Sequence, residues 1–108
     1  MDLTGHTFQG KYDILERLTE DGSTETYKAR HSLLDTEHIV KIMKPHAISS
    51  SIEVKEFQIE MQELAQNPSD KIGIAVDFSI LIDGRPYAIL VPPSRITLNF
   101  KSRANNEH

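Results

Sequence analysis

The chain has 108 residues, no cysteine and a formal net charge of -4 at pH 7. This length suits one domain with a modest core, and the lack of cysteine excludes a disulfide framework and a zinc-thiolate site and fits a reducing compartment. The acidic balance argues against nucleic-acid binding, which uses a basic face, and no stretch approaches the roughly 18 apolar residues of a membrane-spanning helix. We therefore expect a cytoplasmic protein that binds neither nucleic acid nor membrane.

The first part of the chain predicts a lead-in and three antiparallel strands. Residues 1–9 are polar and contain glycine, which is typical of a lead-in. The apolar-rich segments 12–18 and 25–30 flank a polar turn and predict a hairpin. After a second turn, residues 38–43 form a β-branched, apolar strand, and Pro45 ends it.

One amphipathic helix is predicted over residues 50–66. Ser50 and Glu53 have the spacing of a capping box, in which each side chain bonds to the backbone N–H of the other residue. Apolar residues then recur at helical steps of three and four, which indicates a face that packs on a sheet. That face consists of Val54, Phe57, Met61 and Leu64.

Two further strands follow the helix. Residues 73–82 are apolar and rich in β-branched residues, Asp83 and Gly84 form a hairpin turn, and residues 86–91 predict the returning strand. The order is three strands, one helix and two strands. This order predicts an α+β fold, a five-stranded twisted antiparallel sheet that carries one main helix.

The C-terminal segment is harder to assign. In residues 94–100, apolar residues alternate with polar ones, which fits either a short sixth strand or a linker. The apolar positions are Ile96, Leu98 and Phe100. Residues 101–108 are polar and are expected to be a disordered tail, so the folded domain is expected to span residues 10–93.

Six segments occur in a fixed order across this domain: 10–18, 27–31, 38–41, 57–60, 75–78 and 83–91. Their sequences and spacings resemble the first to fifth strands and the helix of bacterial serine/threonine protein kinases. The resemblance covers roughly residues 8–93 and implies the N-terminal small lobe (N-lobe) of a kinase, without the large C-terminal lobe (C-lobe). It places Lys41 at the position of the strand lysine that holds nucleotide phosphates, and Glu60 at that of its helix glutamate.

The position of Lys41 in an apolar strand also predicts a negatively charged partner. A lysine inside an apolar strand is costly unless a carboxylate or a phosphate meets it. Glu60 is the expected partner, and Glu56 and Glu63 on nearby helical turns are the rivals. The remaining alternative is a solvated lysine whose stem covers apolar neighbours.

This sequence differs from the kinase family in the loop that covers the phosphates. In the family this loop carries glycines, so that backbone N–H groups can approach the phosphates. Thr19, Asp21 and Thr24 stand at those three positions. Asp21 adds a charge that repels phosphate.

The adenine side departs from the family at three positions. Thr26 replaces the valine that packs above adenine, and Ile39 replaces a small alanine on the strand face of Lys41. Leu90 aligns with the residue that guards the pocket, and Pro93 stands where the linker donates a backbone N–H, which proline lacks. We therefore expect a degenerate nucleotide pocket, filled by these side chains.

No enzyme activity is expected, because phosphoryl transfer needs a catalytic-loop Asp, an Asn and a magnesium-binding Asp. The sequence contains no His-Arg-Asp motif. The 5 histidines show no ligand spacing, so neither a metal nor another cofactor is expected.

The function expected from the sequence is a non-catalytic, pseudokinase-like N-lobe module that acts in protein–protein interaction or regulation. Its partner would be a kinase, a kinase C-lobe or a second copy, with Ile96, Leu98 and Phe100 as the candidate interaction surface. The alternative is the small lobe of a truncated or split serine/threonine kinase that binds ATP weakly or together with a separate C-lobe. A third option is an adaptor within a larger multidomain protein.

Overall fold

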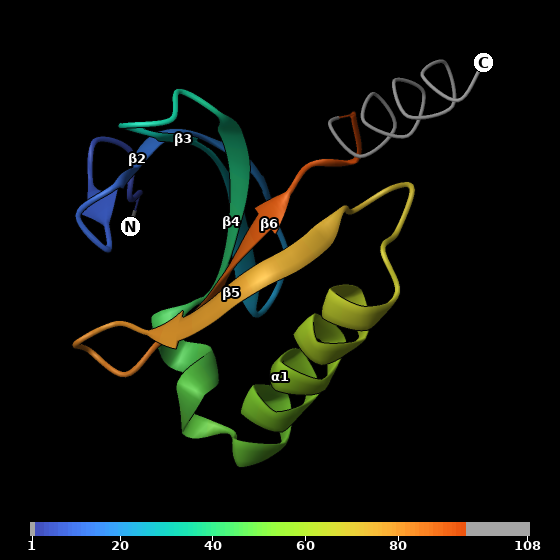
Figure 1. Ribbon diagram of the computed structural model, residues 1–108. Coiled ribbons are helices and arrows are strands. Elements are labelled where there is room, and N and C mark those ends of the chain that lie inside the picture. Colours follow the sequence, from blue (N-terminus) through green and yellow to red (C-terminus); the bar gives the residue numbers. More distant parts are fainter. Residues whose placement is uncertain (1, 95–108) are drawn as a thin grey trace.

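The structure, a computed structural model, describes residues 2–94 and shows a curled sheet with one helix against it (Figure 1). The elements are β1 (Thr7–Phe8), β2 (Tyr12–Glu20), β3 (Thr24–His31), β4 (Glu37–Met43), the 3-10 helix η1 (Pro45–Ser49), α1 (Ser51–Gln66), β5 (Ile74–Ile80) and β6 (Pro86–Val91). Neighbouring strands pair antiparallel in the sheet order β1-β2-β3-β4-β6-β5. The predicted α+β class is confirmed, as is the order of strands around the helix. Within the described residues, no helix is long and apolar enough to cross a membrane.

Residues 2–9 contain a short strand that the sequence did not predict. The two-residue strand β1 pairs with the start of β2, and Leu3 and Phe8 are each only 4% exposed. The chain reverses between these strands because Gln9 and Gly10 adopt positive φ angles of 54° and 66°. Two apolar residues in a polar stretch are too short a pattern to identify a strand from the sequence.

The sheet therefore has six strands where five were expected, and β1 is the additional one. The short sixth strand that the sequence suggested for 94–100 lies outside the described residues, apart from Ser94. The same holds for the tail expected over 101–108 and for the candidate interaction residues Ile96, Leu98 and Phe100.

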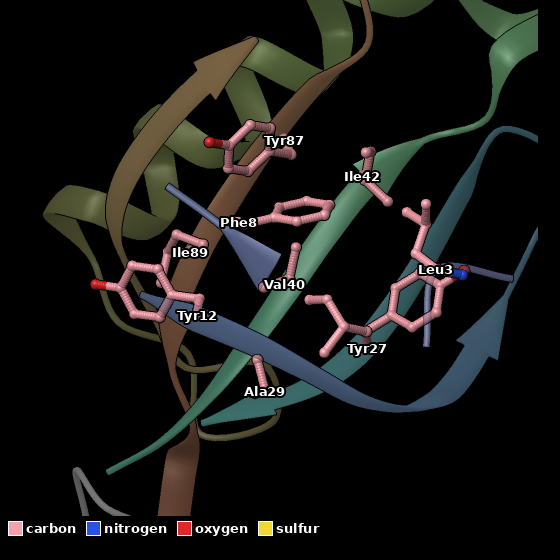
Figure 2. Packing of buried hydrophobic residues seen from close by; sticks show 10 residues of the cluster. Leu3, Phe8, Tyr12, Tyr27, Ala29, Val40, Ile42, Tyr87 and Ile89 are labelled. Atoms are coloured by element: carbon pink, nitrogen blue, oxygen red, sulfur yellow. The ribbon is translucent and has the colours of Figure 1, made fainter. Parts of the chain in front are cut away.

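The inner face of the curled sheet carries an aromatic-rich core (Figure 2). Phe8 from β1 meets Tyr87 from β6 edge to face, with ring centroids 4.9 Å apart, and the Tyr27 hydroxyl accepts the backbone N–H of Leu3 at 3.2 Å. These contacts explain why the chain before β2 folds back over the sheet. The cluster consists of Leu3, Phe8, Tyr12, Ile14, Tyr27, Ala29, Val40, Ile42, Tyr87 and Ile89.

Helix α1 covers the opposite face of the sheet. The predicted stripe is confirmed, since Phe57, Met61 and Leu64 are buried and Val54 packs against the same cluster. Burial of such a stripe supplies most of the stability of a helix of this length. The cluster also contains Met43, Ala47, Ala75, Ala88 and Leu90.

The predicted capping box is half formed. Ser50 Oγ accepts the backbone N–H of Glu53 at 3.2 Å, as expected for an N-cap. The backbone N–H of Ser50 donates instead to the carbonyl of Ala47 at 3.2 Å. The 3-10 helix that precedes α1 thus replaces the second half of the box.

Gly73 joins the loop after α1 to the end of β6. Its backbone exchanges two hydrogen bonds with Ser69, each of 2.9 Å, and its φ angle is 111°. A Cβ atom at this position would overlap the carbonyl oxygen of Val91. Only glycine combines this φ angle with so close an approach to another backbone segment.

We expect Gly73→Ala to lower the free energy of unfolding by roughly 1–3 kcal/mol, because it adds a clash to a backbone conformation that L-residues avoid. Gly22→Ala is the matched control, since a Cβ there meets nothing within 4 Å and its φ angle is not positive. Urea unfolding of the two variants and the wild type measures the effect. Equal losses in both variants would show that the contact with Val91 does not constrain the fold.

Candidate functional site

The sheet register brings the predicted pocket residues onto one face. Thr19 lies opposite Thr26, and Thr26 lies opposite Lys41, across β2, β3 and β4. Ile39 lies opposite Leu90 across β4 and β6. Because opposed residues in an antiparallel pair share a face and residues i and i+2 share it too, all five side chains lie on the face that α1 covers.

These residues line a cavity of about 320 Å³. Pro93, just after β6, also lines it, together with three residues that sequence reasoning did not identify. The three are Leu18 from β2 and Lys71 and Ile72 from the loop between α1 and β5. No local sequence pattern identifies Lys71 and Ile72, because they come to this face through the tertiary fold, close to the approach of Gly73 to Val91.

The expectation that side-chain bulk fills the nucleotide pocket stays a prediction, but a cavity is present beside these residues. Ile39 packs against the cluster beneath α1, lies opposite Leu90 and still lines the cavity. The volume of about 320 Å³ is at the lower end of the range of ligand pockets, about 300–1,000 Å³. The residues that differ from the kinase family therefore change which groups line the cavity, and they do not close it.

Lys41 and Glu60 are in contact across the gap between β4 and α1. The distance from Lys41 Nζ to Glu60 Oε2 is 3.4 Å, and that to Oε1 is 3.5 Å. Both exceed the 2.7–2.9 Å typical of a charge-assisted hydrogen bond. Within residues 2–94, neither Glu56 nor Glu63 forms an ion pair with Lys41. A pair with one partly exposed member contributes little, about 0–1 kcal/mol.

A second hollow of about 380 Å³ lies on the other side of Lys41 and is strongly acidic. Its charged lining residues are Asp21, Lys41, Glu53, Glu56 and Glu60. Four carboxylates against one ammonium give it a net charge of -3. Sequence reasoning identified Glu53 only as a helix-capping residue, because the proximity of the first turn of α1 to Lys41 exists only in the folded chain.

Asp21 occupies the backbone donors of the β2–β3 turn. Its Oδ1 accepts the N–H groups of Ser23 and Thr24 at 2.9 and 2.7 Å, and its Oδ2 accepts the Thr24 hydroxyl at 3.0 Å. Burial raises the pKa of this carboxyl, but the hydrogen bonds from Ser23 and Thr24 outweigh it, so the pKa is lowered. A carboxylate of the chain itself thus takes the N–H groups that a phosphate would need here.

We expect Asp21→Ala to lower the free energy of unfolding at pH 7 by about 1 kcal/mol, because it leaves two backbone donors and a hydroxyl without their acceptor. Since folding lowers the pKa of Asp21 from its ordinary value of 3.8, its contribution is complete above that pH and is lost as the pH falls through the folded-state pKa. The gap between wild type and variant should therefore close on acidification.

The control for this variant is Asp70→Ala, at an exposed turn residue. Urea unfolding from pH 7 to pH 3 provides the comparison. A difference between wild type and Asp21→Ala that stays constant down to pH 3 would contradict the role of the ionised carboxylate.

Comparison with known proteins identifies the fold. No protein-family model and no curated protein matches the sequence. Among solved structures, a double mutant of the Mycobacterium tuberculosis PknI kinase domain superposes with a TM-score of 0.61 at 20% identity, over 81% of this chain and 34% of that one. The kinase domain of PF14_0431 superposes with a TM-score of 0.64 at 13% identity, over 81% of this chain and 26% of that one.

The chain thus spans about a third or less of these kinase domains. Identities of 20% and 13% establish the fold and leave the activity open. The described part of this chain has the fold of a protein-kinase N-lobe.

Proposed function

We propose that this chain is a pseudokinase-like N-lobe module that does not bind ATP productively and acts through contacts with another protein. The observation that carries the first half of the proposal is the charge around Lys41. The hollow beside its ammonium group has a net charge of -3. In a kinase N-lobe, this lysine holds phosphates that carry several negative charges of their own.

Neutralising phosphate requires an excess of positive charge or free backbone donors. In this hollow the one ammonium is already shared with Glu60, and the turn donors are already bound to Asp21. A triphosphate would therefore meet like charge and occupied N–H groups. The cost is greatest where solvent is partly excluded, because screening by water is weaker there.

The adenine side also lacks the backbone donor that the family uses. Pro93 lines the cavity at the edge where a backbone N–H would meet adenine, and proline has none. Pro92 precedes it, so a shift of the alignment by one residue gives the same result. A buried adenine nitrogen without a hydrogen-bond donor costs about 1–3 kcal/mol of binding free energy.

The alternative is the small lobe of a serine/threonine kinase that binds ATP with a separate C-lobe. The contact between Lys41 and Glu60 and the open cavity of about 320 Å³ favour it. The acidic hollow and Pro93 weigh against this alternative. Both belong to this chain, so they remain when a separate C-lobe is added.

Nucleotide binding separates these two proposals. A ligand that binds only the folded state raises the melting temperature by mass action. Because we propose that ATP does not bind, we expect no rise in melting temperature with millimolar ATP and magnesium. Adenosine is the matched probe, since it keeps the base and lacks the phosphates. ATP that binds more tightly than adenosine, with the difference lost in Lys41→Gln, would overturn the proposal, because the phosphates would then add affinity.

The second half of the proposal is supported by the edge of the sheet. In the described residues β5 pairs with β6 on one side only. Three of its apolar side chains are exposed, with Val76 at 52%, Phe78 at 39% and Ile80 at 63%, and Asp77 and Ser79 lie between them. An apolar edge strand of this kind is a template for pairing with another chain.

A groove of about 290 Å³ lies beside this edge, between α1 and β5. Met61 and Ala65 from the helix and Ala75, Val76 and Phe78 from the strand form its apolar part. A partner that adds a strand to β5 could place side chains in this groove, so that main-chain bonds give affinity and the groove gives specificity. The edge and the groove together are named the β5 edge surface.

A second copy of the chain can test this surface directly. We expect concentration-dependent dimers in sedimentation velocity and their loss in Ile80→Lys, because a charge on the exposed face of an edge strand opposes strand pairing. Leu33→Lys is the control, since Leu33 is 85% exposed on the turn between β3 and β4. Dimers that survive Ile80→Lys but not Leu33→Lys would place the contact elsewhere, and a monomer at all concentrations would exclude pairing between copies.

A further inference from the structure

The cavity of about 320 Å³ that Lys41 lines has groups that suit a ligand other than a nucleotide. Apart from Lys41, Lys71 and two threonines, its lining residues are apolar. The apolar ones are Leu18, Ile39, Ile72, Leu90 and Pro93. Two cationic residues line this cavity and no carboxylate does, whereas the hollow on the other side of Lys41 has four carboxylates.

Three polar groups in the lining have no partner among the described residues. The Thr19 hydroxyl, the Thr26 hydroxyl and the Lys71 ammonium make no hydrogen bond or ion pair within residues 2–94. Thr19 and Thr26 lie opposite each other on β2 and β3. An apolar cavity into which a few polar groups converge is the usual form of a small-molecule site.

The two lysines are not equivalent. Lys41 is already in contact with Glu60 at 3.4 Å and also interacts electrostatically with Asp21. Lys71 has neither an ion pair nor a carboxylate among the other residues of the cavity lining. The uncompensated positive charge of the cavity is therefore that of Lys71.

We propose that this cavity binds a small apolar molecule with a single carboxylate. The apolar body lies against Leu18, Ile39 and Leu90, and the Lys71 ammonium pairs with the carboxylate. The hydroxyls of Thr19 and Thr26 are the remaining donors. This inference concerns a ligand and goes beyond the proposed protein contacts, which involve the β5 edge surface.

The charges on the two sides of Lys41 explain why such an acid fits and a nucleotide does not. A nucleotide that places its base in the cavity extends its phosphates toward Asp21, Glu53 and Glu56, where the net charge is negative. A monoacid keeps its one negative charge on the side of Lys71 and stays out of that hollow. The volume of about 320 Å³ restricts the ligand to a small one.

The test uses 2-naphthoate as the probe and 2-naphthamide as its uncharged isostere, with the full chain. We expect saturable binding of naphthoate in isothermal titration calorimetry and up to about fivefold weaker binding of naphthamide, since an ion pair with an exposed lysine is worth about 0–1 kcal/mol. Lys71→Gln should bring naphthoate down to the affinity of naphthamide. Lys55→Gln, an exposed lysine on α1, is the matched control and should leave both affinities unchanged.

A second variant tests the apolar part of the lining. Leu18 is 45% exposed, so Leu18→Ser should leave the fold intact and weaken naphthoate and naphthamide by the same factor. Absence of saturable binding, equal affinity for acid and amide, or an equal effect of Lys71→Gln and Lys55→Gln would overturn the proposal. These outcomes are independent of the dimer test with Ile80→Lys, because no residue of β5 lines the cavity.

Discussion

The alternation of side chains along β4 is the constraint on which the rest of the structure depends. This strand pairs with β3 on one side and β6 on the other. Val40 and Ile42 point into the aromatic-rich core and are fully buried, so Ile39 and Lys41 must point to the opposite face. A shift of the register by one residue would bury Lys41 in that core. The position of the lysine is therefore a consequence of the packing of its neighbours.

From this placement follows the division of the α1-covered face into two hollows of unlike charge. Lys41 lies between them and lines both. On one side, the first turn of α1 and the β2–β3 turn contribute carboxylates. On the other side, the loop after α1 contributes Lys71 and apolar residues. The fold is that of a kinase N-lobe, and the hollow beside its lysine has four carboxylates and one ammonium group in its lining.

The sequence predicted the elements whose periodicity is long enough to recognise. The helical stripe from Val54 to Leu64, the two hairpins and the strand around Lys41 follow from steps of two or of three and four residues. Strand β1 was missed because two residues carry no periodicity, and its role depends on Phe8 meeting Tyr87, which lies far away in the sequence. Secondary structure was thus predictable wherever it was set by local pattern.

The site was predictable to a smaller extent. The family resemblance placed Thr19, Thr26, Ile39, Leu90 and Pro93 in one pocket with Lys41, and the structure brings them together. It could not supply the charge of the hollow beside Lys41, which combines Asp21 with glutamates some thirty residues later in the chain. Nor could it place Lys71, because a loop residue acquires its neighbours from tertiary contacts alone.

The close approach of Gly73 to Val91 has a further consequence for the cavity. Lys71 and Ile72 come just before this contact in the chain, and Pro93 comes two residues after Val91. One backbone contact therefore fixes two walls of the cavity relative to each other. If the proposed ligand binds here, it does not have to bring these two segments together, and this lowers the entropy cost of binding. For the ligand class proposed above, we therefore expect the spacing of these two segments to limit the size of the molecule that binds.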